Sequence, residues 1–231
     1  MSRIFILILS IIATVNVTQA ANMVVIHSND TKLFSKGELL NTEVSQNIPA
    51  KVKITVVFES GSVKTVTGPY SQPLKDPLAI SDPNLVITLA NFLKKKSIFR
   101  SRGENPGNPW LVDVNTTKRF YCIAPSYNVI LWRPYSDSQT ASTLLIKHTR
   151  TGKTVKIRWP AYQKVLKWPS NLKVKYGDTY KIEVQTRSNS SIKKLVLHQL
   201  PSGLPTKSHK VVWMVGRGCI RQANQLLSRL W

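Results

Sequence analysis

Between residues 110 and 200 the chain consists of short β-type segments separated by turn residues, and this pattern limits the fold more than any other feature. Segments that predict strands lie at about 110–114, 119–124, 128–133, 142–149, 153–159, 178–186 and 192–199. The Arg150-Thr-Gly-Lys153 sequence between two of them is typical of a hairpin loop. Because no helical periodicity separates these strands, the pattern favours a β-sandwich over an α/β sheet.

A smaller β module is predicted before residue 104. Apolar residues occupy every second position from Val52 to Phe58, so they share one face of a strand. Turn residues follow at 59–62 and β-branched residues return at 63–67. Together these segments predict a hairpin over residues 51–67.

A helix is predicted after this hairpin. Asp82 offers an N-cap, and Pro83 suits the first helical turn. Apolar residues then recur at helical spacing at Leu85, Leu89, Phe92 and Leu93. The end of the helix leads into Lys94, Lys95 and Lys96. Their charges either complement the negative end of the helix dipole or form an anion-binding patch.

The stretch 101–109 is rich in Gly, Pro and Asn, which is typical of a linker. We therefore predict a small β module with a helix at 21–103 and a β-sandwich with a C-terminal helix at 104–231. That last helix is predicted over residues 208–230, where apolar residues recur with a period near 3.6, and it is expected to be loosened at Gly216 and Gly218. The expected fold class is mainly β, of the α+β type.

Residues 1–20 are predicted to be a secretory signal peptide. Arg3 precedes an apolar run at 4–15, and Thr18-Gln-Ala20 provides a small-residue cleavage site. The run is shorter than the roughly 20 residues that span a bilayer, so a retained membrane anchor is the less favoured alternative. We expect a periplasmic or secreted protein with no transmembrane span after cleavage.

Export makes the cysteines interpretable, because disulfides form and persist in oxidising compartments. The chain has two cysteines, Cys122 and Cys219, so one disulfide between them is predicted. It would close a loop of about 97 residues and stabilise the folded state by roughly 4–5 kcal/mol on a chain-entropy argument. No metal site and no cofactor is predicted, because the histidines lack metal-ligand spacing. They are His27, His148, His198 and His209.

Positive charge is concentrated in the second half of the chain. The sequence has 33 Lys and Arg against 11 Asp and Glu, a net charge of +22. Residues 21–90 contain six basic and six acidic residues. Apart from Arg3 in the predicted signal peptide, all the other charged residues lie in 91–231, which contains 26 basic and five acidic ones. This asymmetry suggests an anionic envelope polymer, a membrane surface or an acidic protein as the partner. The alternative is a solvated basic surface without a partner, and export removes most nucleic acids from reach.

The candidate anion-binding residues lie in stretches rich in Lys and Arg. They are Lys94, Lys95, Lys96, Lys153, Lys156, Arg158, Lys164 and Lys167. Trp159 and Tyr162 lie among them, and aromatic residues interleaved with cations can bind nucleic acid or sugars by stacking. Strand alternation offers another interpretation, in which Trp159 belongs to the core while Lys156 and Arg158 are exposed.

Parts of the chain resemble known families. Trp132 in one strand and Gly177-Asp-Thr-Tyr180 before another resemble the core tryptophan and strand entry of fibronectin type III or immunoglobulin-like sandwiches. Gly61 and Gly68-Pro69 resemble the periplasmic β region of FecR-type sensors. The mature chain also resembles a group of exported bacterial proteins of unassigned function, in pieces such as Gly68-Pro-Tyr70, Leu131-Trp-Arg-Pro134 and Gly218-Cys219. These resemblances imply an accessory role in the cell envelope and no catalytic activity.

A cysteine enzyme is the alternative function. Gly218-Cys-Ile-Arg221 is similar to the nucleophile motif of L,D-transpeptidases. That similarity implies Cys219 as a thiolate nucleophile, His198 as a base and Arg221 near a site that acts on peptidoglycan. The Ser/Thr and His of the motif are replaced by Gly and Arg at positions 216 and 217. We therefore predict a non-catalytic binding or scaffolding protein of the bacterial cell envelope.

Overall fold

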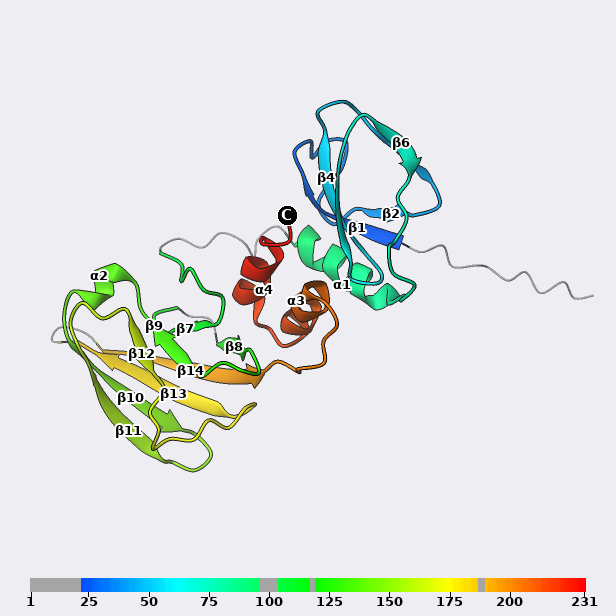
Figure 1. Cartoon of the computed structure of the whole chain (residues 1–231). Helices are drawn as coiled ribbons and strands as arrows, with labels where there is room; N and C mark the ends of the chain where they lie inside the picture. The colour runs from blue at the N-terminus through cyan, green and yellow to red at the C-terminus, as the bar shows by residue number, and fades with distance from the viewer. Residues whose placement is uncertain (1–21, 96–103, 117–118, 187–189) are drawn as a thin grey trace, which may run out of the picture.

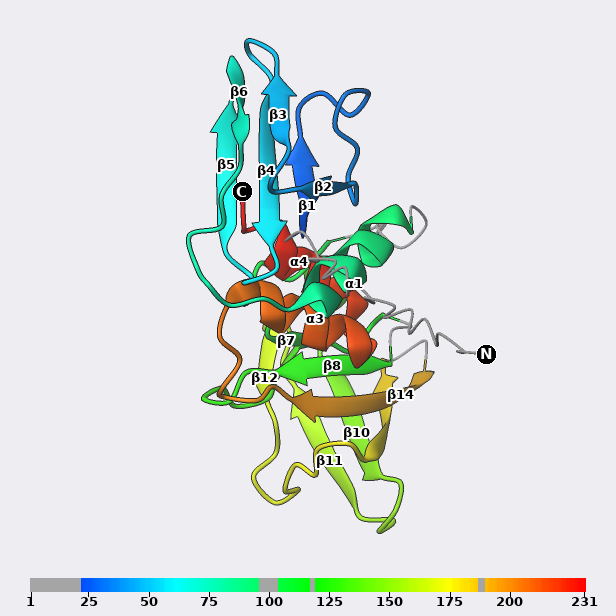
Figure 2. The same ribbon diagram turned by 90° about the vertical axis from the view of Figure 1, so that its right-hand side faces the viewer.

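The computed structural model describes residues 22–95, 104–116, 119–186 and 190–231 (Figure 1). Strands account for 38% and helices for 17% of the structure, which confirms the predicted mainly β fold with few helices. Two β-rich parts lie at opposite ends of the molecule with helices between them (Figures 1 and 2). No helix within the described ranges is long and apolar enough to cross a membrane. The predicted signal peptide at 1–20 and the candidate Lys96 lie outside the described residues.

The N-terminal part is built on an antiparallel sheet with the strand order β2-β1-β4-β5. Its strands are β1 (Asn22–Ser28), β2 (Leu39–Asn41), β4 (Lys53–Phe58) and β5 (Val63–Thr67). A second antiparallel pair consists of β3 (Ser45–Ile48) and β6 (Tyr70–Pro73). The predicted hairpin over 51–67 is confirmed as β4–β5. Ile54, Val56 and Phe58 lie in one core cluster, as their alternation predicts.

Helix α1 (Pro83–Lys94) begins where the sequence predicts. The Asp82 side chain accepts a hydrogen bond from the backbone N–H of Asn84 at 3.1 Å, which satisfies one unpaired donor of the first turn. The buried face of α1 shares a core with Val24 and Val57 of the N-terminal sheet. Those residues alternate with the ones that face the β3–β6 pair, so the sheet is covered on both faces.

The second part is a β-sandwich of a five-stranded and a three-stranded sheet (Figure 1). The five-stranded sheet has the order β11-β10-β13-β14-β8. Its strands are β8 (Phe120–Ile123), β10 (Ser142–His148), β11 (Thr154–Trp159), β13 (Thr179–Gln185) and β14 (Ser190–Gln199). The other sheet has the order β12-β9-β7, with β7 (Leu111–Asp113), β9 (Ile130–Trp132) and β12 (Val165–Lys167). Neighbouring strands are antiparallel except for the pairs β14–β8 and β7–β9.

The core of the sandwich lies between these two sheets. Trp159 and Tyr180 are both fully buried there, together with Leu131 from the opposite sheet. Trp132, which the family resemblance assigns to the core, is buried but lies outside this cluster. The reason is strand alternation, since Leu131 points between the sheets and its neighbour must point away. The short helix α2 (Tyr135–Ser138) follows directly.

The C-terminal segment forms two helices, α3 (Lys207–Gly216) and α4 (Ile220–Leu227), so the helix predicted over 208–230 is divided in two at the glycines expected to loosen it. The chain turns at Gly218, whose φ of +76° is a conformation that glycine adopts at little cost. Met214 of α3 and Leu226 of α4 share a core cluster with α1 and β1. The C-terminal helical segment, predicted to accompany the sandwich, therefore also packs against the N-terminal part.

Candidate anion-binding face

Strand β11 carries two of the predicted anion-binding residues on its outer side. Lys156 and Arg158 are exposed, while Val155 and Trp159 are buried in the core. This confirms the alternation interpretation for this strand. Lys153 lies just before β11 and is also exposed.

The register of the five-stranded sheet brings three further lysines into line. Lys147 of β10 lies opposite Lys181 of β13, and Lys181 lies opposite Lys194 of β14. All three side chains are exposed. They share the outer face with Lys156 and Arg158. Lys156 lies opposite Leu145 of β10, and Leu145 is on the same side of that strand as Lys147 because the two are two positions apart. We call the set Lys147, Lys156, Arg158, Lys181 and Lys194 the cationic face.

Negative charge on this face is sparse. Within the part of the chain that the structure describes, none of the five cations forms an ion pair within 4.0 Å. Glu183 shares the outer side of β13, and its Oε1 accepts hydrogen bonds from Gln185 and Ser190 at 2.7 and 2.8 Å. These bonds, followed by the nearby charge of Lys181, hold the pKa of Glu183 below its usual value. The face keeps a positive balance of five cations and one carboxylate.

Like charges that lie directly opposite on neighbouring strands destabilise a sheet by roughly 0.2–1 kcal/mol a pair. The row Lys147–Lys181–Lys194 contains two such pairs. Folding stability therefore does not account for the row, whereas an external anion that neutralises it would relieve the repulsion.

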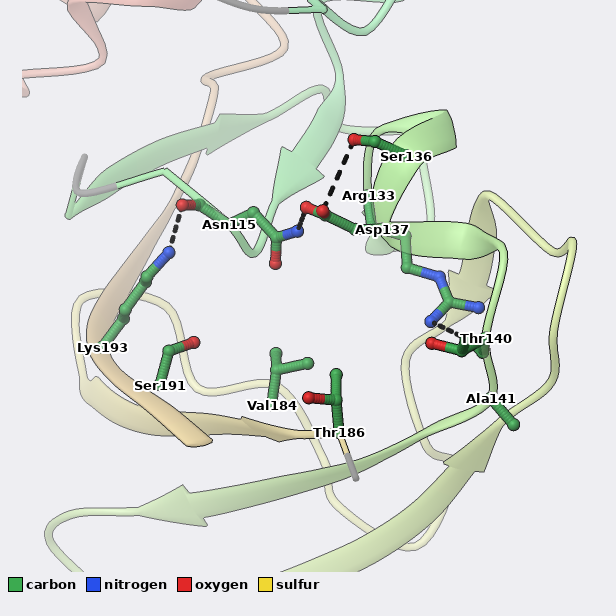
Figure 3. Close-up of a pocket in the computed structure, with 10 residues that line it drawn as sticks. All are labelled: Asn115, Arg133, Ser136, Asp137, Thr140, Ala141, Val184, Thr186, Ser191 and Lys193. Atoms are coloured by element: carbon green, nitrogen blue, oxygen red, sulfur yellow. Dashed lines mark hydrogen bonds between the residues drawn. The ribbon is translucent and has the colours of Figure 1, made fainter. Parts of the chain in front are cut away.

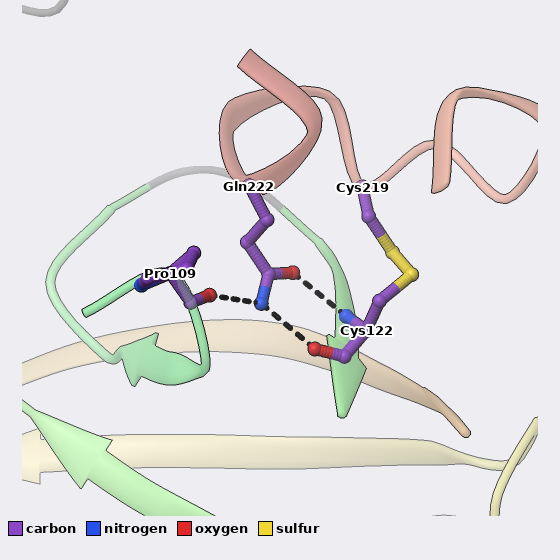
Figure 4. Close-up of a disulfide and its surroundings, with 4 residues drawn as sticks. All are labelled: Pro109, Cys122, Cys219 and Gln222. Carbon is purple, nitrogen blue, oxygen red and sulfur yellow. Dashed lines mark hydrogen bonds between the residues drawn. A yellow bond between two sulfur atoms is a disulfide. The ribbon is translucent and has the colours of Figure 1, made fainter. Parts of the chain in front are cut away.

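Helix α4 covers the β8 edge of the same sheet and so limits the cationic face to the other strands. Cys122 of β8 and Cys219 form the predicted disulfide, with an S–S distance of 2.01 Å (Figure 4). Both cysteines are buried, with exposed fractions of 0% and 1%. The Gln222 side chain also contacts this edge, since its carboxamide bonds to both backbone polar groups of Cys122 (Figure 4).

The remaining predicted cations lie elsewhere. Lys164 pairs with Glu104, with Nζ and Oε1 2.8 Å apart, and lies over the ring of Tyr135. Lys167 belongs to β12, in the other sheet of the sandwich. Lys94 and Lys95 are exposed at the end of α1. The structure therefore brings together only Lys156 and Arg158, with Lys153 nearby.

The anion-binding residues predicted from the sequence do not include Lys147, Lys181 or Lys194. Each occupies an outward position in a predicted strand, so alternation alone could have marked them as exposed. Their alignment depends on strand order and register, which a single sequence does not reveal.

Most of the aromatic side chains in this region lie in the core and not on the surface. Trp159 and Tyr180 are fully buried, and Trp168 packs edge-on against Tyr180 with ring centroids 5.1 Å apart. The Trp168 indole N–H donates to the carbonyl of Leu172 at 2.6 Å. Tyr162, by contrast, is 73% exposed. The buried rings cannot offer faces for stacking on nucleic acid bases.

The three residues of the alternative enzyme do not form an accessible nucleophilic site in this structure. Cys219 is bonded to Cys122, so its sulfur is not a thiolate. Arg221 donates to the buried carboxylate of Asp113 at 2.6 Å. His198 lies opposite Cys122 in the β14–β8 register. Burial, with a smaller effect of Arg217, lowers the pKa of His198 and favours the neutral ring.

No protein-family model matches the chain, and no curated protein matches it either. In the described parts of the chain no three His, Cys, Asp or Glu residues are grouped so that they could hold a metal ion.

Proposed function

We propose that the protein is an exported, non-catalytic binding protein of the bacterial cell envelope, and that its cationic face binds an extended anionic polymer. The observation that carries this proposal is the row Lys147–Lys181–Lys194, in which lysines face each other across three neighbouring strands. Neighbouring strands lie about 4.8 Å apart, so the three Cα positions span roughly 10 Å. Closely spaced charges along one polymer can neutralise such a row, whereas one small anion reaches only part of it.

The binding energy would come from several weak contacts. A single exposed ion pair contributes about 0–1 kcal/mol, so one lysine alone would bind little. Several contacts to one polymer add up, and they release the counterions condensed along it. Affinity should therefore fall steeply as salt concentration rises, because surface charges are screened over about 8 Å at physiological ionic strength.

The disulfide supports the envelope location in this proposal. Structural disulfides persist in the periplasm and outside the cell, and they are rare in the reducing cytosol. The buried Cys122–Cys219 pair ties the helix layer to the sandwich that carries the cationic face.

The decisive experiment compares two triple variants of the mature, disulfide-bonded protein with the same net charge. The first, Lys147→Gln/Lys181→Gln/Lys194→Gln, removes the row. The matched control, Lys32→Gln/Lys64→Gln/Lys167→Gln, removes three exposed lysines elsewhere. The ligands are polyphosphate, poly-glutamate and phosphatidylglycerol vesicles. The dissociation constant is measured between about 50 and 300 mM salt, over which the Debye length falls from about 14 Å to about 6 Å.

The row variant should bind the two polymers about tenfold or more weakly, and its slope of log affinity against log salt should shrink by about 2. The control should keep most of the affinity. A loss of affinity of the same size in both triple variants would refute a specific binding face, because overall charge alone would then explain the binding. Preference for vesicles over both polymers would overturn the choice of a polymer as partner.

A further inference from the structure

A polar pocket of about 700 Å³ opens at one end of the sandwich, beside helix α2, the end of β13 and the start of β14 (Figure 3). The lining includes two cations, Arg133 and Lys193, and one carboxylate, Asp137. Side chains with hydroxyl or amide groups complete much of it, among them Asn115, Thr140 and Ser191. Pockets of this size accommodate small ligands. It lies on the other side of the five-stranded sheet from the cationic face.

Lys193 lies on the inner side of β14. It is opposite Ile182 and two positions from Leu195, and both of these residues belong to the sandwich core. Alternation therefore directs Lys193 between the sheets, where an ammonium group is costly unless it is paired. Its Nζ donates to the backbone carbonyl of Asn115 (Figure 3). Burial lowers the pKa of Lys193, with smaller opposing effects of Asp113 and Asp137.

Arg133, the second cation of the pocket, is buried, with an exposed fraction of 1%. Its guanidinium donates to the hydroxyl of Ser142 at 2.9 Å and to the carbonyls of Gln163 and Thr140 at 3.1 and 3.3 Å. It also lies 4.7 Å from the ring centroid of Trp159. These partners are neutral, so they hold the group in place without cancelling its charge.

Asp137 does not neutralise both cations. Its carboxylate accepts hydrogen bonds from Asn115 and from Ser136, the latter at 3.4 Å (Figure 3). Within the described ranges neither Arg133 nor Lys193 forms an ion pair with a carboxylate within 4.0 Å. The pocket thus combines an excess of positive charge with several neutral hydrogen-bonding groups.

We propose that this pocket binds an anionic sugar. The carboxylate or phosphate of the sugar would pair with Lys193, which lacks a charged partner among the residues that the structure describes. The sugar hydroxyls would bond to Ser191, Thr140 and Asn115. A carboxylate and a phosphate can both pair with an ammonium group, so the experiment compares a sugar acid with a sugar phosphate. The site is independent of the cationic face, because Lys193 and its neighbour Lys194 point to opposite sides of β14.

The test titrates the mature, disulfide-bonded protein with four probes and follows ¹⁵N-resolved NMR shifts and heat of binding. The probes are glucuronate, glucose 6-phosphate, glucose and inorganic phosphate. At least one anionic sugar should bind about tenfold or more tightly than glucose, with shifts centred on the pocket, and the preferred acid identifies the group that Lys193 recognises. Inorganic phosphate that binds as tightly as both anionic sugars would overturn the sugar assignment. Absence of binding by both anionic sugars would overturn the site.

Two lysine variants provide a matched pair. Lys193→Met removes the ammonium group and keeps an apolar chain of similar length on the inner side, so sugar binding should weaken about tenfold or more. Lys194→Met changes the adjacent, outward lysine, so it should leave sugar binding unchanged and weaken polymer binding. Wild-type sugar affinity in Lys193→Met would refute the proposal. Ser191→Ala, which keeps both cations, should weaken sugar binding several-fold, and an unchanged affinity would refute the assigned hydroxyl contact.

Discussion

The carboxamide of Gln222 pairs with both backbone polar groups of Cys122, as a neighbouring strand would. Its Oε1 accepts from the Cys122 N–H at 2.7 Å, and its Nε2 donates to the Cys122 carbonyl at 2.8 Å and to the carbonyl of Pro109 at 2.5 Å (Figure 4). Strand β8 is the last strand of the five-stranded sheet, so these backbone groups would otherwise lack a strand partner. A helix side chain and a disulfide together close this sheet edge.

Replacing Gln222 should destabilise the protein strongly. Gln222→Ala removes three hydrogen bonds and leaves buried backbone groups unpaired, which should lower the free energy of unfolding by about 2–4 kcal/mol. Urea unfolding followed by circular dichroism measures the change. Asn224→Ala on the same helix is the control and should cost less than about 0.5 kcal/mol. Equal stability of the two variants would contradict the role assigned to Gln222.

The disulfide gives a second prediction. The native protein should contain no thiol that reacts with a thiol reagent, because both sulfurs are bonded and buried. Cys122→Ala/Cys219→Ala should lower the free energy of unfolding by about 4–5 kcal/mol, since the bond closes a loop of 97 residues. Denaturant titration of the variant against the oxidised wild type measures this. A reactive Cys219 in the native protein would contradict the prediction and favour the cysteine-enzyme alternative.

Local features of the fold could be predicted from the sequence because they depend on neighbouring residues. The alternation from Val52 to Phe58 identifies a strand that the structure confirms, and Asp82 with Pro83 marks the start of α1. Both signals arise from contacts within a few residues. Gly216 and Gly218 mark a weak point in the C-terminal helix, but the complete break into two helices could not be predicted, because a glycine is tolerated within a helical pattern as well as at its end.

The candidate site depended on distant pairs, and this part could not be predicted. Lys147, Lys181 and Lys194 are separated by 34 and 13 positions, so only the strand register aligns them. In the sequence, Lys193 cannot be distinguished from a surface lysine by residue type. Its position two residues before the core residue Leu195 is a weak signal that it faces inward. The disulfide was an exception, because a chain with two cysteines allows only one intramolecular pair.

The lysine row predicts a conflict between binding and stability. Lys181 lies opposite a lysine on both sides, so Lys181→Gln removes two unfavourable pairs. The free energy of unfolding should rise by about 0.5–1 kcal/mol at low salt, and the gain should shrink at high salt because the repulsion is screened. Lys167→Gln is the control, since Lys167 lies opposite Ile130. A gain of the same size in the control would show that the effect is not cross-strand repulsion.

The carboxylate of Asp178 should make the free energy of unfolding depend on pH in the acid range. Its carboxylate is 2.8 Å from His148 Nε2 and 2.7 Å from Arg150 Nη2, and so links the β10–β11 hairpin to the start of β13. The hydrogen bond with His148, and then the charge of Arg150, hold the pKa of Asp178 below its usual value.

A carboxylate whose pKa is lower in the folded state stabilises that state above its unfolded pKa. This contribution is lost as pH falls below about 4 through the folded pKa. Wild-type protein should therefore be more stable than Asp178→Asn near neutral pH, and the difference should shrink as the solution is acidified. Arg150→Gln should move this loss to higher pH, because it removes a charge that lowers the pKa of Asp178. Urea unfolding of the three proteins from pH 7 to about 2.5 tests this, and a difference between wild type and Asp178→Asn that stays constant over that range would contradict it.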